Sequence, residues 1–321
     1  YQADQGLSPT TQAILDHTIP LLGLEIMRLH SRSVLEHQQK NSFVEELIAQ
    51  DFKSEEAMLE RGRYLGLNFS HTCLLLVFAV DEFSSPGRQK TGERESQLLQ
   101  AQLQRALTRQ LQQTSPAPFL VGFRGDSLVV VTTWPPEQGR EEITSAASEL
   151  ARNILLYLKR SFPTLGFTGG VGLPQQGIRK AGLSFSQAWQ AIALGRQIRG
   201  GGRVYCYHRL GVYRLLCSHP DPQELLALRD EILGPLADYD EKQRANLLET
   251  LAAYFAHNED VNATAAALFV HPNTVRYRLE RAAKLLGRDL NWLEDRFQLY
   301  LALKIAGLFP FAPAEKKEGQ A

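Results

Sequence analysis

Positive charge is concentrated in the stretch VHPNTVRYRLERAAKLLG, at residues 270–287, although the net charge of the whole chain is zero. The chain balances 35 lysines and arginines against 35 aspartates and glutamates, whereas this stretch holds a single acid, Glu280. Its basic residues are Arg276, Arg278, Arg281 and Lys284, with Arg288 one position beyond its end. An arginine can hold a guanine edge or a phosphate with two parallel hydrogen bonds. The residue types of this stretch are therefore suited to binding DNA.

The spacing of the apolar residues predicts that this stretch is a helix with one buried face. Val275, Leu279 and Leu286 recur with the period of an α-helix. Pro272 suits the first turn of that helix, and Gly287 suits the position just after its end. The polar residues on the remaining faces, with the histidine that precedes the helix, are the candidate DNA contacts. These candidates are His271, Asn273, Thr274, Arg276, Tyr277, Arg278 and Arg281.

The candidate contacts divide by their chemistry. We expect the arginines to supply phosphate and base contacts, and the asparagine, threonine and tyrosine to supply positioning or base readout. Polar groups at the start of a helix also benefit from the helix dipole, which favours anions there. His271 fits two roles equally well, a phosphate contact and a purely structural helix cap. The same basic face would also suit an ordinary solvent-exposed helix, so this stretch alone leaves both interpretations open.

A short alanine-rich segment, NATAAALF at 262–269, comes immediately before this helix. Its small side chains would let a second helix cross it closely. Two short helices joined by a tight turn, the second one basic at its exposed N-terminal half, form the helix-turn-helix arrangement of many DNA-binding proteins. The turn Phe269-Val270-His271 departs from the usual pattern, because it lacks the glycine frequently found there.

Residues 250–308 resemble the C-terminal helix-turn-helix domain of the PucR/CdaR family of bacterial transcription regulators. The resemblance is carried by the pattern TA..L.VH.NTV.YRL, by G.DL after it, and by a closing L.LAL helix. Upstream, residues 182–216 resemble the end of the sheet domain of the same family, so the likeness extends over roughly residues 40–310. This resemblance implies a cytoplasmic transcription regulator that binds double-stranded DNA.

Members of this family usually carry a small-molecule sensing domain at the N-terminus. The chain shows no such domain beyond a possible trailing helix, and it begins with Tyr1 rather than with Met. The resemblance therefore implies an unknown small-molecule effector whose site would lie mostly outside this chain. It also suggests control of catabolic or nitrogen-related genes.

Segments of helical and strand character alternate through the middle of the chain. We expect helices at 54–65, 93–113, 138–160 and 184–198, strands at 73–80, 166–172 and 202–207, and a hairpin at 119–134. From residue 208 onward we expect only helices, at 209–217, 222–233, 242–256, 263–269, 272–286 and 292–308. The predicted fold class is α+β, with a long N-terminal helix, an antiparallel α/β sheet domain and an all-α C-terminal domain.

The sheet domain of the family resembles a nucleotide cyclase fold, which places a Gly-Gly-Asp-Glu-Phe signature on a hairpin turn and needs acids to hold metal. Here Arg124 replaces one glycine of that signature and Ser127 replaces its glutamate. Asp81 and Glu82 could supply part of a metal site, but acids are also common on exposed turns. We therefore expect a degenerate GGDEF-like domain with no catalytic residue, metal or cofactor, and a protein that is not an enzyme. The alternative is a nucleotide-binding or cyclase-like enzyme acting through residues 70–207.

A narrow apolar stripe near the N-terminus predicts a helix that pairs with a second copy of the chain. The stripe repeats every three to four residues, as in a coiled coil. It comprises Leu15, Ile19, Leu22, Ile26 and Leu29, and it returns in phase at Phe43 and Leu47. Pro20 conflicts with a continuous helix. We expect a homodimer or a higher homo-oligomer, and the alternative is an amphipathic helix packed on its own domain.

These patterns together predict the domain boundaries. Residues 1–50 form a linker or dimerisation helix, 51–207 the GGDEF-like domain, 208–245 a helical connector, 246–310 the helix-turn-helix domain, and 311–321 a disordered tail. The three cysteines lack the spacing of metal ligands. The apolar runs are too short to span a membrane. We therefore expect no metal and no membrane partner.

Overall fold

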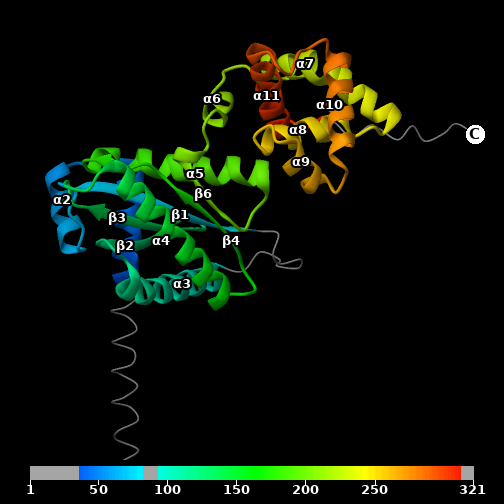
Figure 1. Ribbon diagram of the computed structural model, residues 1–321. Helices are drawn as coiled ribbons and strands as arrows, with labels where there is room; N and C mark the ends of the chain where they lie inside the picture. Colours follow the sequence, from blue (N-terminus) through cyan, green and yellow to red (C-terminus); the bar gives the residue numbers. More distant parts are fainter. Residues whose placement is uncertain (1–35, 82–92, 312–321) are drawn as a thin grey trace, which may run out of the picture. The chain divides into compact units, whose positions relative to one another are not determined.

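The chain divides into two compact units, Tyr1–Arg209 and Leu210–Ala321, in the computed structural model (Figure 1). The structure describes residues 36–81 and 93–311. Within these ranges no helix is both long enough and apolar enough to cross a membrane. The described part of the first unit contains a sheet flanked by helices, and that of the second unit contains helices only. The fold class is therefore α+β, as predicted.

The sheet of the first unit runs in the order β2-β3-β1-β4-β6, and the short β5 pairs with one end of β1. The central strand β1 pairs antiparallel with β3, β4 and β5. The prediction of an antiparallel sheet fails at one edge, where β6 pairs parallel with β4. A parallel pair needs a crossover connection, and α5 supplies it. The strands are β1 Thr72–Asp81, β2 Phe119–Arg124, β3 Ser127–Trp134, β4 Gly166–Val171, β5 Gln175–Gln176 and β6 Val204–Cys206.

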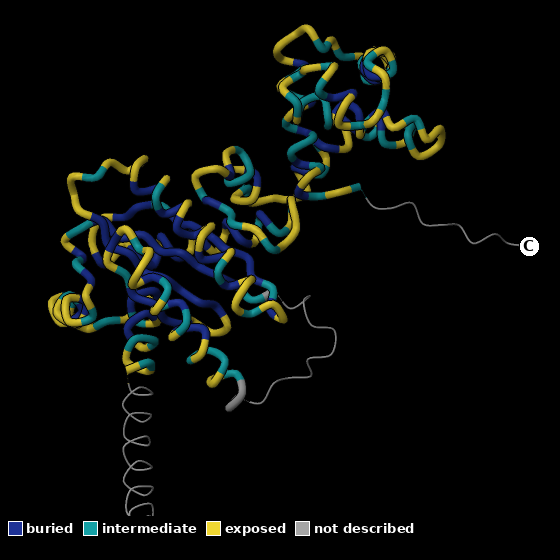
Figure 2. Tube along the Cα trace, turned by 60° about the horizontal axis from the view of Figure 1, so that its bottom comes forward, coloured by how far each residue is buried: buried dark blue, intermediate teal, exposed yellow. Residues whose placement is uncertain are grey.

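The apolar run of β1 is buried on both faces of the sheet, which explains why it is continuous rather than alternating. Leu74 and Leu76 belong to the core beneath α3 and α4. Cys73 and Leu75 belong to the core on the opposite face, beneath α5 and α2. Figure 2 shows the strands as a buried layer between more exposed helices. These helices are α2 Glu55–Tyr64, α3 Glu93–Thr114, α4 Arg140–Ser161 and α5 Ala181–Arg199.

Helix α5 lies very close to β4, because glycines on and after this strand leave room for it. A Cβ atom at Gly170 would lie 2.1 Å from the carbonyl oxygen of Ala188, and one at Gly172 would lie 2.1 Å from that of Ser184. The Ser184 hydroxyl also accepts a hydrogen bond from the backbone N–H of Leu75, at 3.0 Å. This close approach fixes α5 against the centre of the sheet.

Residues 36–49 are helical, and this helix packs on the sheet of its own unit. Phe43 and Leu47 are fully buried in the core beneath α2 and α5. The prediction that the pairing stripe returns at these two residues is therefore wrong, because the sheet unit already covers both. The other stripe residues, Leu15, Ile19, Leu22, Ile26 and Leu29, lie outside the described residues.

The second unit is a set of helices around one core. This core takes its apolar residues from α7, α8, α9, α10 and α11. Figure 1 shows α10 lying among the neighbouring helices of this unit. The helices are α6 Tyr213–Cys217, α7 Pro222–Gln243, α8 Leu247–Ala256, α9 Val261–Leu268, α10 Pro272–Leu286 and α11 Leu293–Leu308.

The predicted end of the helix at 222–233 is wrong, because α7 continues through Pro235 to Gln243. Ile232, Leu233 and Leu236 on both sides of the proline are buried in the core. Their burial offsets the lost backbone hydrogen bond of an internal proline, which costs about 3 kcal/mol. Tertiary packing thus overrides the local helix-breaking signal.

Two further helix starts differ from the prediction. Helix α8 begins at Leu247 instead of residue 242, because the Asp240 carboxylate accepts hydrogen bonds from the backbone N–H groups of Leu247 and Leu248, at 2.9 and 2.7 Å. Helix α6 begins at Tyr213 instead of residue 209, after Gly211 adopts a φ of 54°. A left-handed residue interrupts a helix at that point.

Candidate nucleic-acid interface

The turn between α9 and α10 is a tight helix ending built on Phe269. The backbone N–H of Val270 donates to the Ala265 carbonyl oxygen at 3.0 Å, and the N–H of Phe269 donates to that of Ala266 at 3.4 Å. These two bonds form a Schellman motif, whose left-handed position is usually a glycine. Phe269 occupies it with a φ of 54°, and its side chain is 94% exposed. The expected turn is therefore present without its usual glycine.

His271 is the cap of α10. Its Nδ1 atom accepts a hydrogen bond from the backbone N–H of Asn273, at 3.2 Å. This geometry satisfies one of the free N–H groups at the start of the helix. His271 is exposed to solvent. Pro272 follows in the first turn, where the absence of its N–H costs nothing.

One face of α10 is buried and holds the helix in the core. Val275 is 0% exposed, and Leu279 and Ala282 are also buried against the other helices of the unit. Leu286 is half-buried at the last turn, and Gly287 ends the helix with a φ of 61°. The predicted helix at 272–286 and its buried stripe are both confirmed.

Asn273 and Arg276 form a linked pair on the exposed side of α10. The Arg276 guanidinium donates a hydrogen bond to the Asn273 side-chain oxygen, at 2.8 Å. Both residues are exposed, and Thr274 beside them is half-buried. The bond uses one of the five N–H donors of the arginine. The remaining donors can reach a ligand in front of the N-terminal half of the helix.

Arg278 points toward α8. Its guanidinium donates to the Thr250 hydroxyl at 3.3 Å, and the residue is half-buried. Thr250 is itself fully buried, and its hydroxyl donates to the Asn246 carbonyl oxygen at 2.6 Å. Arg278 is therefore partly tethered to the neighbouring helix, unlike Arg276.

Arg281 lies between two tyrosines from different helices. It donates a hydrogen bond to the Tyr277 hydroxyl at 2.5 Å and another to the Tyr239 hydroxyl on α7. The hydrogen bond to Tyr277, followed by the charge interactions with both tyrosines, raises the pKa of Arg281 above its ordinary value. The guanidinium is exposed and remains charged at any physiological pH.

Arg288 contributes less to the basic face than its position suggests. Its guanidinium forms an ion pair with the Asp295 carboxylate at 2.9 Å. Asp295 also accepts a hydrogen bond from the backbone N–H of Asp289 at 2.8 Å. That backbone bond, together with the bond from Arg288, holds the pKa of Asp295 below its ordinary value. The pair closes the loop between α10 and α11.

The structure brings all seven predicted contact residues onto α10 and its cap, and it adds two residues that the sequence pattern missed. Thr250 on α8 and Tyr239 on α7 each bind an arginine of α10. They are distant from α10 in the sequence, and no local motif marks them. A contact between helices of this kind is visible only in the folded chain.

The hairpin of β2 and β3 carries a single acid, Asp126. The turn between β2 and β3 is Gly125-Asp126, with a φ of 57° at Gly125. Ser127 is buried at the start of β3. Among the described residues, no group of three or more His, Cys, Asp or Glu side chains could hold a metal ion. Glu82 and the side chain of Asp81 lie outside the part of the chain that the structure describes.

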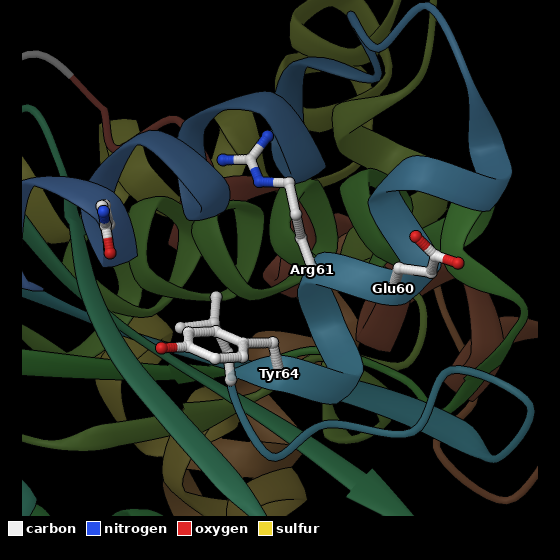
Figure 3. Close-up of a pocket in the computed structure, with 5 residues that line it drawn as sticks. Glu60, Arg61 and Tyr64 are labelled. Carbon is white, nitrogen blue, oxygen red and sulfur yellow. The ribbon is translucent and has the colours of Figure 1, made fainter.

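A hollow of about 520 Å³ lies beside α2, lined by Gln39, Glu60, Arg61, Tyr64 and Leu65 (Figure 3). Arg61 already forms an ion pair with Glu46 at 2.6 Å and lies over the Phe43 ring. Glu60 and Arg61 point in different directions from α2 in Figure 3. The lining groups therefore do not converge on a common point, as they would in a ligand site.

Two protein-family models match the chain. Residues 247–305 match the PucR C-terminal helix-turn-helix domain, which covers α8 to most of α11. Residues 50–194 match the GGDEF-like domain, which covers most of the sheet unit.

Several curated proteins are similar to the chain. The proline-responsive transcriptional activator PutR of Bacillus subtilis is 31% identical over 52% of this chain and 41% of its own length. The carbohydrate diacid regulator of Escherichia coli is 28% identical over 88% of this chain and 70% of its own length. The purine catabolism regulatory protein of Bacillus subtilis is 24% identical over 95% of this chain and 55% of its own length. The chain thus spans about half the length of two of these relatives.

Proposed function

We propose that the chain regulates transcription by binding double-stranded DNA. It carries a GGDEF-like domain and a PucR C-terminal helix-turn-helix domain. Its relatives are regulators of the PucR/CdaR type. Helix α10 is the recognition helix of this proposal. It enters the major groove, while α9 crosses the phosphate backbone beside it.

The exposed basic face of α10 is the observation that carries this proposal. Because Val275 and Leu279 face the core, Arg276 and Arg281 lie on the solvent side. Arg276 and Asn273 are the main proposed contacts in the N-terminal half of α10. There the helix dipole favours phosphate and the side chains reach base edges. The predicted contacts His271, Thr274, Tyr277 and Arg278 complete this proposed surface.

The sheet unit has a non-catalytic role in this proposal. The hairpin turn carries Ser127 where a cyclase signature has its glutamate, so the carboxylates available to hold metal on a triphosphate are too few. The unit instead connects an effector-dependent signal to the DNA-binding unit. The effector is a small molecule, and its site lies mostly outside the chain.

The regulated genes belong to a catabolic or nitrogen-related pathway in this proposal, and the protein acts in the cytoplasm, where bacterial DNA lies. The names of the relatives support the first part, since they refer to proline, carbohydrate diacids and purine catabolism. We further propose that the DNA-binding species is a homodimer or a higher homo-oligomer. A single helix-turn-helix reads few base pairs, and two copies on a palindromic site extend the readout.

Selection of bound sequences from random DNA with the purified chain tests the proposal. We expect an enriched, palindromic sequence motif. Binding to the selected duplex is then compared with binding to a scrambled duplex, as a function of salt concentration, because phosphate contacts alone bind all sequences. If no sequence is enriched and the chain binds no duplex even at low salt, the proposed function is wrong.

A matched pair of variants tests whether an arginine of α10 contributes more to DNA binding than an arginine elsewhere on the surface. Arg276→Ala removes one positive charge from α10, and Arg160→Ala removes one from an exposed position in the last turn of α4. We expect the first variant to bind the selected duplex more weakly and the second to bind it like the parent. Equal losses in both variants would mean that only the overall charge of the protein attracts DNA.

A further inference from the structure

The contact between Arg281 and Tyr239 joins the recognition helix to a helix outside the matched helix-turn-helix domain. Tyr239 lies on α7, whereas that domain begins at residue 247. The Arg281 guanidinium carbon lies 5.1 Å from the centre of the Tyr239 ring and 5.9 Å from that of the Tyr277 ring. The hydroxyl groups of both tyrosines accept hydrogen bonds from the same guanidinium.

We propose that Tyr239 is a positioning residue for DNA binding by Arg281. In this arrangement Tyr239 and Tyr277 set the direction of the Arg281 side chain before α10 meets DNA. The inference rests on the proposed function, and it extends the DNA-binding unit to α7.

The geometry leaves Arg281 able to bind DNA while it is held. A guanidinium has five N–H donors in a fixed planar fork, and the two tyrosine hydroxyls occupy one on each terminal nitrogen. The Nε–H and one N–H on each terminal nitrogen remain for a phosphate or a base edge. Arg281 is also exposed, so a ligand can reach these donors.

Holding the side chain in advance lowers the entropic cost of binding. An arginine loses considerable rotamer freedom when it is fixed at an interface, and a side chain already fixed by the fold loses less. Tyr239 is half-buried and packs against the core that contains Leu236 of α7 and Val275 of α10. The α7 backbone is therefore a firm support for the tyrosine.

The test compares Tyr239→Phe in the parent and in an Arg281→Ala background, by fluorescence anisotropy with a labelled mixed-sequence DNA duplex at low salt. Phenylalanine keeps the ring and removes the hydroxyl acceptor. We expect Tyr239→Phe to weaken binding about two- to tenfold in the parent. It should have no further effect in the Arg281→Ala background, since Tyr239 acts through Arg281.

A matched control removes a hydroxyl elsewhere in the same unit. Tyr300 on α11 contacts Lys304 through its ring, and Tyr300→Phe keeps that ring contact. We expect this control to bind DNA like the parent. Thermal unfolding should show similar Tm values for the parent and both phenylalanine variants, so that weaker binding is not a loss of fold.

Three results would overturn the inference while the parent still binds DNA. The first is parent-like DNA binding by Tyr239→Phe. The second is tighter DNA binding by this variant, which would mean that the hydroxyl withholds Arg281 from DNA. The third is an equal loss of affinity in the parent and in the Arg281→Ala background. If the parent itself binds no duplex, the proposed function fails, and this inference fails with it. Weaker binding in the parent background alone supports the positioning role.

Discussion

Arg278 on α10 donates a hydrogen bond to the Thr250 hydroxyl on α8, with 3.3 Å between the two atoms. Arg276, one half-turn earlier, instead bonds Asn273 on its own helix, at 2.8 Å. The two arginines have the same chemistry, but only Arg278 ties the recognition helix to its neighbour. Substituting them should therefore have different consequences for stability.

Arg276→Ala should weaken DNA binding and leave stability unchanged. If Arg276 contacts a base, the loss should be about 1–3 kcal/mol for the specific sequence. If it contacts a phosphate, the slope of log K against log salt concentration should fall by about one unit. Titrations of the selected duplex at several salt concentrations distinguish the two. Parent-like affinity and salt slope would exclude Arg276 from the interface.

Arg278→Ala should weaken DNA binding and also destabilise the helical unit, by about 1 kcal/mol for the lost hydrogen bond to Thr250. Thr250 keeps its own bond to the Asn246 carbonyl oxygen, so the residue left behind is not unsatisfied. Chemical unfolding of the parent, Arg276→Ala and Arg278→Ala checks this difference. Equal stability of the two variants would show that the bond across the helices contributes nothing.

Asp295→Asn should destabilise the loop between α10 and α11 near neutral pH. The folded pKa of Asp295 is lowered from its ordinary value of 3.8, first by the Asp289 backbone N–H and then by Arg288. Because the folded pKa is lowered, the charged carboxylate stabilises the fold at pH values above the ordinary pKa of the group. This stability is lost as the pH falls through the folded pKa. The difference in Tm between parent and variant should therefore shrink on acidification in that range.

Glu294→Gln is the matched control for this prediction. Glu294 is the adjacent acid in the first turn of α11, it is exposed, and its one described partner is Gln298, at 3.3 Å. We expect its effect on stability to stay within about 0.5 kcal/mol at every pH. A pH-independent Tm difference for Asp295→Asn would contradict the role assigned to the Asp295 charge.

Purified protein incubated with GTP and Mg²⁺ or Mn²⁺ should form no cyclic dinucleotide. Ser127 stands where the cyclase signature has its glutamate, and Arg124 stands where it has a glycine. With too few carboxylates to hold metal, the reaction should be absent rather than slow. Product above a no-enzyme control, measured by chromatography, would refute the prediction and favour the enzyme alternative.

Charged residues in the N-terminal stripe should convert the protein to a monomer. Leu22→Glu with Ile26→Glu would place unpaired charges in the predicted pairing seam, which is costly. We expect a shift to lower mass in sedimentation, weaker binding to a full palindrome, and an intact helix-turn-helix fold. As a control, Gln38→Glu adds a charge at an exposed position of the helix at 36–49. Unchanged sedimentation of a folded double variant would exclude the seam.

The sequence pattern predicted α10 to the residue, because its signals are local. Pro272 and Gly287 mark its ends, and Val275 and Leu279 mark its buried face. The strand predicted at 73–80 is also present, as β1 Thr72–Asp81, because its apolar run is long enough to need cover on both faces. Elements that carry their own start, stop and periodicity can be predicted without a structure.

Several failures share a tertiary cause. Helix α7 crosses Pro235 because buried leucines on both sides hold it, and β6 pairs parallel because α5 returns the chain to the far side of β4. Tyr239 and Thr250 reach arginines that lie far along the chain. None of these features leaves a local mark in the sequence, since each depends on which elements come to lie together.

The central position of β1 also determines the order in which the protein can fold during synthesis. Thr72 at its start pairs with Trp134 on one side and with Gln176 on the other. The ribosome therefore releases this apolar strand well before either partner exists, and its edges stay open for that time. Such sequence-distant pairing is slow and exposes the nascent chain to aggregation. The described part of the second unit contains helices only, whose backbone hydrogen bonds are local, so we expect the sheet unit to set the pace of folding.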